Sequence, residues 1–333
     1  MQTDARILRN AAWHEADAQA RPPALSILSP VFRFDPSALI AALAQACRAA
    51  PDLAVELVLV DDGSGDPALL AQLEAAVMAF PAPASLVAFT ANQGRSAARN
   101  RLTREARAPY LLFLDCDMLP DSTDFLARWS QLIADAAPAI AYGGFTTLQV
   151  PDEPRLALAR ALAERVDCLP AAERTARGGV AVATSNLLVR ADILRAVPFD
   201  AGFQGWGWED VDWALRAHAA GHPVLHVDIP ATHLGLDEPE TVLRKFAQAG
   251  PNFTHMLARH PQMRALRSTR VIQTLASLPG IGLLARPLRV LATSEAVPMG
   301  VRTRAARGWR ALHAALALRT APRPAAGALH AAH

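Results

Sequence analysis

Residues 56–66 read ELVLVDDGSGD, a short apolar run that ends in two acids and a turn. A run of this length bounded by turn residues is typical of a strand that is buried on both faces. Gly63, Ser64 and Gly65 provide the turn. Asp61 and Asp62 therefore stand where a buried strand finishes, which is where open α/β sheets bind their ligands.

Strands and helices alternate on both sides of this stretch. Apolar strands separated by helices of ten to fifteen residues predict an α/β fold, a mostly parallel sheet with both faces covered. The carboxyl ends of such strands share one edge of the sheet. The strands are expected at 24–30, 56–60, 85–89 and 110–114, and the helices at 37–50, 67–80 and 95–106.

A second pair of acids, Asp115 and Asp117, follows the apolar strand 110–114. Alternate residues of an extended chain share one side, so both carboxylates point the same way and Cys116 points the other. Two converging carboxylates suit a hard divalent ion such as Mg²⁺ or Mn²⁺, which commonly shares its ligands with phosphate groups. Taken alone, this short pattern is explained equally well by a polar loop after a strand.

Five segments, taken in order, resemble the family 2 glycosyltransferases, an inverting family with the GT-A fold. The last segment is most similar to bacterial members that transfer galactosyl and N-acetylhexosaminyl groups, including polysaccharide polymerases. The resemblance covers roughly residues 24–255. Its segments are LSPVF (28–32), VDDGS (60–64), NQGRSAARN (92–100), FLDCD (113–117) and GWGWEDVD (205–212).

The resemblance implies a metal-dependent, inverting hexosyltransferase of polysaccharide biosynthesis. Its donor would be a nucleotide diphosphate sugar, with UDP favoured because a carboxylate can accept from a uracil N–H. Its acceptor would be a hydroxyl of a saccharide or of a lipid-linked acceptor. The nucleotide-sugar-binding residues would be Pro30, Phe32, Asp61, Asp62, Asn92, Gly94, Arg95, Arg99, Asp115, Trp206 and Gly207.

The implied metal is Mn²⁺ or Mg²⁺, held by Asp115 and Asp117 and by a later histidine. His233 is the first candidate for that histidine and His226 the second, and a purely structural histidine is the alternative. Histidine suits Mn²⁺ better than Mg²⁺. Arg99 lies in a segment that would face the nucleotide, although bracing of the sheet edge by Arg99 and Asn100 explains the same residues.

By the same resemblance, Asp210 is the base that activates the acceptor hydroxyl, and Glu209 orients the acceptor or the donor sugar. A positioned base contributes about 10²–10⁴-fold to the rate. Trp206 and Trp208 would offer flat faces to a sugar ring. The alternative is that Glu209, Asp210 and Asp212 cap a helix, because acids favour a helix N-terminus.

Composition supports a folded chain: of 333 residues, 52% are hydrophobic and 19% charged. The three cysteines have unrelated spacings and predict neither a disulfide framework nor a zinc site. The N-terminus has acids and no apolar run, so no signal peptide is expected, and no stretch of about 18 apolar residues predicts a span. We expect a cytoplasmic protein.

The C-terminal region differs in charge from the rest, because residues 264–333 carry 11 arginines and one acid, Glu295. One hypothesis is that amphipathic helices at 264–319 bind the inner face of the cell membrane. Packing on the catalytic domain or on a second subunit is the alternative, and nucleic acid is not an expected partner. Lys245, in 234–253, either faces phosphate or lies on a solvated helix face. The predicted division is 1–23 extension, 24–255 GT-A domain, 256–320 basic, apolar-rich helical region and 321–333 disordered tail.

Two other classes of protein are alternatives, a nucleotidyltransferase and a non-catalytic binding module. A nucleotidyltransferase uses a similar sheet and metal but has a glycine-rich phosphate loop after the first strand, which SPVFRF (29–34) lacks. A non-catalytic nucleotide-sugar-binding module would not need to keep Asp115, Asp117 and Asp210.

Overall fold

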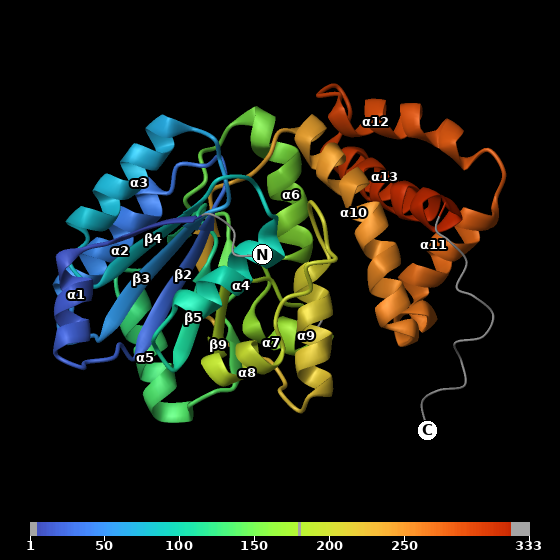
Figure 1. Cartoon of the computed structure of the whole chain (residues 1–333). Helices are drawn as coiled ribbons and strands as arrows, with labels where there is room; N and C mark the ends of the chain where they lie inside the picture. The colour runs from blue at the N-terminus through green and yellow to red at the C-terminus, as the bar shows by residue number, and fades with distance from the viewer. Residues whose placement is uncertain (1–4, 179–180, 321–333) are drawn as a thin grey trace. The chain divides into compact units, whose positions relative to one another are not determined.

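The computed structural model describes residues 5–178 and 181–320 (Figure 1). They form two compact units, one made of residues up to Gln204 together with Glu209–Asp237, and the other of Gly205–Trp208 together with residues from Glu238 onward. This division differs from the predicted domains, because α10 (Pro239–Arg259) crosses the predicted boundary at residue 255. The tail predicted to be disordered, 321–333, lies outside the described residues.

The first unit is built on an eight-stranded sheet in which the four central predicted strands are parallel neighbours. The α/β fold class with a mostly parallel sheet is therefore confirmed. The sheet order is β1 (Ala5–Arg9), β4 (Ala84–Phe89), β3 (Val55–Asp61), β2 (Leu25–Val31), β5 (Tyr110–Leu114), β9 (Asn186–Arg190), β7 (Ile140–Tyr142) and β10 (Leu225–His226).

The described part of the predicted N-terminal extension belongs to this sheet, which corrects that prediction. β1 pairs antiparallel with β4, and α1 (Ala11–Ala18) follows it. Asn10 joins the two, because its side chain caps α1 at Trp13 N and also accepts from Ala84 N, both at 3.0 Å. The signal was weak in the sequence because an edge strand of five residues with two arginines has little apolar run to detect.

Helices cover both faces of the sheet, as predicted. Alternate residues of β3 show how: Leu57 and Leu59 pack into one core, whereas Val58 and Val60 pack into the other. The first core is closed by α2 (Ser37–Ala49), α3 (Pro67–Ala79) and α5 (Phe125–Ala136). The second is closed by α1, α4 (Arg95–Glu105), α8 (Ala191–Ala196) and α9 (Glu209–Ala219).

A small second sheet completes the first unit, with β11 (Ala231–His233) between β6 (Met118–Pro120) and β8 (Phe145–Thr146). β11 runs antiparallel to β6, so His233 pairs with Met118. This register places a histidine that is distant in sequence beside the loop of Asp117. Three shorter helices follow β8: η1 (Pro154–Leu156), α6 (Ala157–Val166) and α7 (Ala171–Arg177).

The second unit is helical, which confirms the expected C-terminal helical region. After α10 come η3 (Pro261–Ala265), α11 (Arg267–Ser277), η4 (Ile281–Leu284), α12 (Ala285–Thr293) and α13 (Met299–Thr320). Ile281, Leu312 and Ala315 form its small core. Within the described residues no single helix has the length and apolar character to cross a membrane, although Arg267–Ser277 with Ile281–Thr293 passes that test as a pair bent by 112°.

Candidate active site

The predicted site segments meet at one edge of the main sheet. β4, β3, β2 and β5 are adjacent and parallel, with Val31 opposite Asp61 and Leu28 opposite Phe113. The loops that follow these four strands therefore emerge together. They contain the predicted residues of 30–32, 61–64, 92–95 and 115–117.

Asp62 organises the loop after β4. Its Oδ1 accepts from Gln93 N at 2.7 Å, and its Oδ2 accepts from Gly94 N at 3.0 Å and from Asn92 Nδ2 at 2.9 Å. Burial raises the pKa of Asp62, and the Gln93 and Gly94 amides oppose that rise. A carboxylate has about four acceptor positions, so about one remains for a ligand.

The loop after β3 packs tightly against the same segment. Gly63 has φ +66°, and a Cβ on it would lie 2.2 Å from the Ala91 carbonyl carbon, so only glycine fits there. Asp61 is buried and accepts from Ser64 N at 3.2 Å and from the Ser64 hydroxyl. Phe32, after β2, is 42% exposed and carries the Arg33 guanidinium over its ring. The edge thus offers a buried carboxylate pair and a partly exposed aromatic side chain.

Arg99, on α4, is only 1% exposed and contacts three carboxylates. Its Nη1 lies 3.2 Å from Glu209 Oε1 and 3.1 Å from Asp210 Oδ1, and its Nη2 lies 3.4 Å from Asp115 Oδ1. Burial disfavours the charged guanidinium, but the three carboxylates outweigh that effect and raise its pKa. Arg99 thus links the predicted metal-binding acid to the predicted base, a role that the sequence did not indicate.

The two adjacent acids of α9 have opposite electrostatic settings. Burial raises the pKa of Asp210 to about 6, with Arg99 opposing and Glu209 and Asp115 adding to the rise. Burial also favours a higher pKa for Glu209, but the charges of Arg99 and Arg95 outweigh burial and hold the pKa of Glu209 below its usual value. Neighbouring acids with separated pKa values are typical of acid–base sites. Of the two, Asp210 has the chemistry of a base near neutral pH.

Thr184, which the sequence did not identify, also holds Asp210. Its hydroxyl donates to Asp210 Oδ1 at 2.9 Å, and its backbone N–H donates to Oδ2 at 3.3 Å. Thr184 precedes β9, which is antiparallel to β5 with Leu114 opposite Asn186. The start of β9 therefore reaches the edge where β5 ends. The polar triplet Thr184-Ser185-Asn186 before an apolar strand was the available signal.

All three acids predicted either to act in the site or to cap a helix lie in the first turn of α9. Asp212 is fully buried and accepts from Arg216 Nε at 2.8 Å, four residues on in α9. Asp212 thus has a structural partner within its own helix. Asn100 likewise serves structure, because its side chain donates to Phe199 O at 2.8 Å and accepts from Phe199 N at 2.9 Å.

Asp117 and His233 form the part of the site that fits a divalent cation. His233 Nε2 lies 3.0 Å from Asp117 Oδ2, whereas Asp117 Oδ1 is buried and has no hydrogen-bond partner among the described residues. Burial would raise the pKa of Asp117, but His233 and Arg95 hold it low. A buried, ionised oxygen without a partner suits a cation. Within the described residues no three His, Cys, Asp or Glu side chains stand together as a ready metal site.

The loop after β11 wraps around this pair. Leu234 N donates to Asp117 O at 2.8 Å, and a Cβ on Gly235 would lie 2.1 Å from Asp117 Oδ2. Gly235 therefore makes the close approach to the carboxylate possible. His226, the second candidate for the metal-binding histidine, is buried in β10 against the Tyr142 ring, with centroids 5.9 Å apart. These contacts indicate a packing role for His226.

Trp206, Gly207 and Trp208 belong to the helical unit, where aromatic packing engages both tryptophans. The Trp208 ring lies 5.1 Å from that of Phe253, and the Trp206 ring 6.0 Å from that of Phe246. Asn252 Nδ2 donates to the carbonyls of Trp206 and Gly207 at 3.3 and 3.0 Å. Each tryptophan thus has an aromatic partner on α10 that sequence reasoning did not identify. Lys245, on the same helix, also has an interaction partner.

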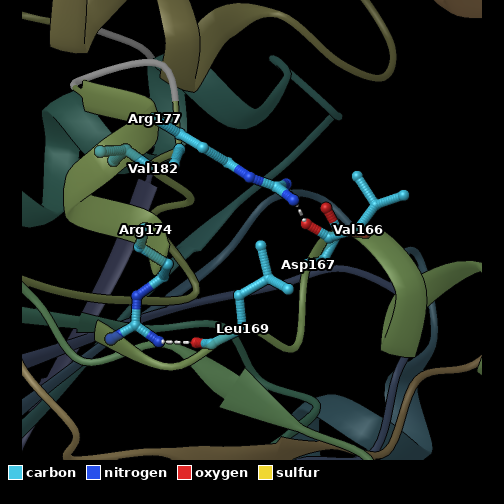
Figure 2. A pocket seen from close by; sticks show the side chains of 7 residues that line it. Val166, Asp167, Leu169, Arg174, Arg177 and Val182 are labelled. Carbon is cyan, nitrogen blue, oxygen red and sulfur yellow. Dashed lines mark hydrogen bonds between the residues drawn. The ribbon is translucent and has the colours of Figure 1, made fainter. Parts of the chain in front are cut away.

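A separate pocket of about 230 Å³ lies among α6, α7 and the segment before β9 (Figure 2). Arg174 donates to Leu169 O, and Arg177 Nη1 donates to Val166 O at 3.0 Å, so both guanidinium groups fasten the α6–α7 connection (Figure 2). None of the residues predicted for the site lines this pocket. Its arginines serve the local fold.

Residues 26–156 match the model of the family described as glycosyl transferase family 2. The chain carries a glycosyl transferase family 2 domain. It is therefore a glycosyltransferase, and the matched segment contains the loops after β2, β3, β4 and β5. No curated protein sequence matches this glycosyltransferase significantly.

Two solved structures are similar to the glycosyltransferase. A mannosyltransferase from Pyrobaculum calidifontis, in complex with GDP-Man and Mn²⁺, is similar with a TM-score of 0.52 and 17% identity over 90% of this chain and 87% of that one. TarS of S. aureus matches with a TM-score of 0.49 and 14% identity over 88% of this chain and 54% of that one. The first likeness supports a GT-A fold.

Proposed function

We propose that this glycosyltransferase transfers a hexose with inversion from a nucleotide diphosphate sugar to an acceptor hydroxyl, with Asp210 as the general base. The observation that carries the proposal is the setting of Asp210. Its carboxylate has a pKa raised to about 6 and contacts the same buried arginine as Asp115 at the ligand-binding edge of the sheet. A base with that pKa is ionised at neutral pH and still accepts a proton readily.

Three neighbours prepare Asp210 for this step. Arg99 favours the ionised carboxylate, and the Thr184 hydroxyl and N–H fix the orientation of its two oxygens. Glu209, held charged by Arg99 and Arg95, raises the pKa of Asp210 and so keeps it basic. In an inverting transfer, Asp210 would take the acceptor's proton as the hydroxyl oxygen attacks the anomeric carbon on the face opposite the leaving diphosphate.

Mn²⁺ or Mg²⁺ is the proposed metal, and Asp115, Asp117 and His233 would hold it. When bound, such an ion would neutralise the charge of the nucleoside diphosphate. The unpartnered Asp117 Oδ1 and the Asp117–His233 pair support this assignment. The P. calidifontis mannosyltransferase was solved with Mn²⁺ and GDP-Man, which favours manganese.

The proposed donor is a UDP-sugar. Support comes from the one acceptor position left on Asp62, which suits a single N–H such as that of uracil, and from Phe32, whose side chain is partly exposed after β2. Asp61, Asn92, Gly94 and Arg95 would complete the nucleotide site, and Pro30 would shape its entrance. We propose a saccharide or lipid-linked hydroxyl of cell-surface glycan synthesis as acceptor.

A thermal-shift screen tests donor and metal together, because a ligand that binds only the folded state raises its stability by mass action. UDP-, GDP- and other nucleotide sugars would each be added with and without Mn²⁺. A UDP-sugar should give the largest Mn²⁺-dependent shift, and Asp117→Asn should abolish it. Equal shifts with and without Mn²⁺ would remove the metal assignment, and a preference for GDP-sugars would remove the UDP assignment.

A further inference from the structure

Helices α11 and α12 and the turn η4 between them carry large apolar side chains that are exposed. Other side chains of this segment, Ile272 and Leu275 among them, pack on the core of Ile281, Leu312 and Ala315. The exposed apolar side chains have exposed fractions of 39% to 84%, with Leu283 the most exposed. They are Val271, Leu278, Leu283, Leu284, Val290 and Leu291. We call these six residues the outer apolar face.

Basic side chains surround this face. Arg264, Arg267 and Arg270 precede the turn, Arg286 and Arg289 follow it, and all five are exposed. Arg289 pairs with Glu240 at 3.1 Å. The only acid in residues 264–333 is Glu295, so the charge around the outer apolar face is strongly positive. A partner for this face must therefore offer an apolar region to the exposed leucines and valines and negative charge to the arginines around them.

We propose that the outer apolar face binds the surface of an anionic lipid bilayer, with Leu283 and Leu284 entering the headgroup–acyl boundary and the arginines contacting anionic headgroups. Exposed leucine and valine on helices flanked by arginine provide both attractions that hold a protein at such a surface. The membrane-binding step is independent of the proposed donor and base.

Helix lengths favour binding at the surface over spanning. α11 has 11 residues and α12 has 9. At about 1.5 Å per residue they are about 17 and 14 Å long, whereas the hydrocarbon core is about 30 Å thick. The bend of 112° prevents the two from acting as one continuous helix. Such a segment fits the interface.

Charge also favours a bilayer over a second copy of the chain as the partner of this face. A two-fold contact through this face would bring its arginines together with those of the other copy, because the same patch occurs on both subunits. An anionic surface instead offers opposite charge to the arginines around this face. Membrane attachment at the inner face would place the enzyme beside a lipid-linked acceptor, and this consequence alone rests on the proposed function.

Vesicle flotation of the full-length protein tests the proposal. The wild type should float with vesicles containing anionic phosphatidylglycerol, float poorly with neutral phosphatidylcholine vesicles, and lose binding at high salt. Leu283→Asp with Leu284→Asp should lower the partition constant at least about tenfold, since burial of one leucine is worth about that factor. Arg270→Gln should lower it about fivefold.

Matched controls come from the sheet unit. Leu148 and Met78 are 78% and 54% exposed, so Leu148→Asp with Met78→Asp makes the same change elsewhere. It should leave flotation unchanged, as should Arg195→Gln. Flotation of the Leu283/Leu284 variant equal to that of the wild type would overturn the proposal. The proposal is also overturned if the wild type does not float and instead forms a dimer that the Leu283/Leu284 variant dissociates. That result would assign the face to a second copy of the chain. Donor turnover in the absence of lipid, measured in parallel, reports separately on the proposed function.

Discussion

Replacing Asp210 with asparagine should abolish most transfer while making the protein more stable at neutral pH. The carboxylate is ionised there at a cost, because its pKa is raised from the ordinary value of 3.8 to about 6. A rise of this size corresponds to about 3 kcal/mol of unfavourable free energy at pH 7 and above. Since the side chain is 20% exposed, solvent screening reduces the expected gain to about 1–2 kcal/mol.

The sign of the pH dependence follows from the direction of the shift. A carboxyl with a raised folded-state pKa adds stability below its unfolded pKa, near 4, and loses that contribution as the pH rises through 6. The wild type should therefore lose stability relative to Asp210→Asn between about pH 4 and pH 7. Above pH 7 the variant should melt about 2–8 °C higher, while its transfer rate falls about 10²–10⁴-fold.

Two measurements on one pair of proteins check this prediction: melting temperature from pH 4 to pH 8, and initial rate with donor and acceptor at saturation. Asp192→Asn is the control, because Arg190 holds the pKa of that exposed acid low. The control should keep full activity and gain no stability as the pH rises. An Asp210→Asn variant that is less stable than the wild type at pH 8 and still active would refute the reasoning.

Three further changes test the neighbours of Asp210 and the metal pair. Arg99→Met should destabilise the fold by about 3–5 kcal/mol in urea titrations, because it leaves three carboxylates without their shared cation; a loss below 1 kcal/mol would contradict the charge network. Thr184→Val removes a hydrogen bond that lowers the pKa of Asp210, so the acid limb of the rate profile should move to higher pH, and an unmoved limb would argue against this contact. Gly235→Ala should weaken Mn²⁺ binding at least about tenfold in calorimetry, because its Cβ would meet the Asp117 carboxylate; unchanged affinity would place the metal elsewhere.

The sheet and most of its site loops could be predicted from the sequence because their signals are local. The strand 56–60 is apolar throughout and ends in a turn, so its type and end can be read from neighbours in the chain. Parallel strands then bring their carboxyl ends to one edge without any further information. That is why Asp61, Asp62, Asp115 and Asp117 were expected at the same edge, where the structure places them.

The remaining features depend on contacts between residues that are distant in the chain. Arg99 and Asp210 are 111 residues apart, and no periodicity links them. Thr184 reaches Asp210 only because β9 runs antiparallel to β5. The aromatic partners of the tryptophans of 205–208 lie on α10, about 40 residues away, so the sequence alone did not reveal these contacts. Charge and aromatic character identify such residues as important, but only the packed structure identifies their partners.

Asp210 is the proposed base, and its buried, charged surroundings set its pKa. The most direct test is the pH dependence of kcat/KM for the donor, which reports the pKa values of the free enzyme, compared between the wild type and Asp210→Glu. The wild type should show an acid limb with a pKa of about 6, and the glutamate variant should retain a weakened limb with a shifted midpoint. A wild-type kcat/KM that stays constant down to pH 4, or a limb identical in both proteins, would contradict the assignment of Asp210 as the base.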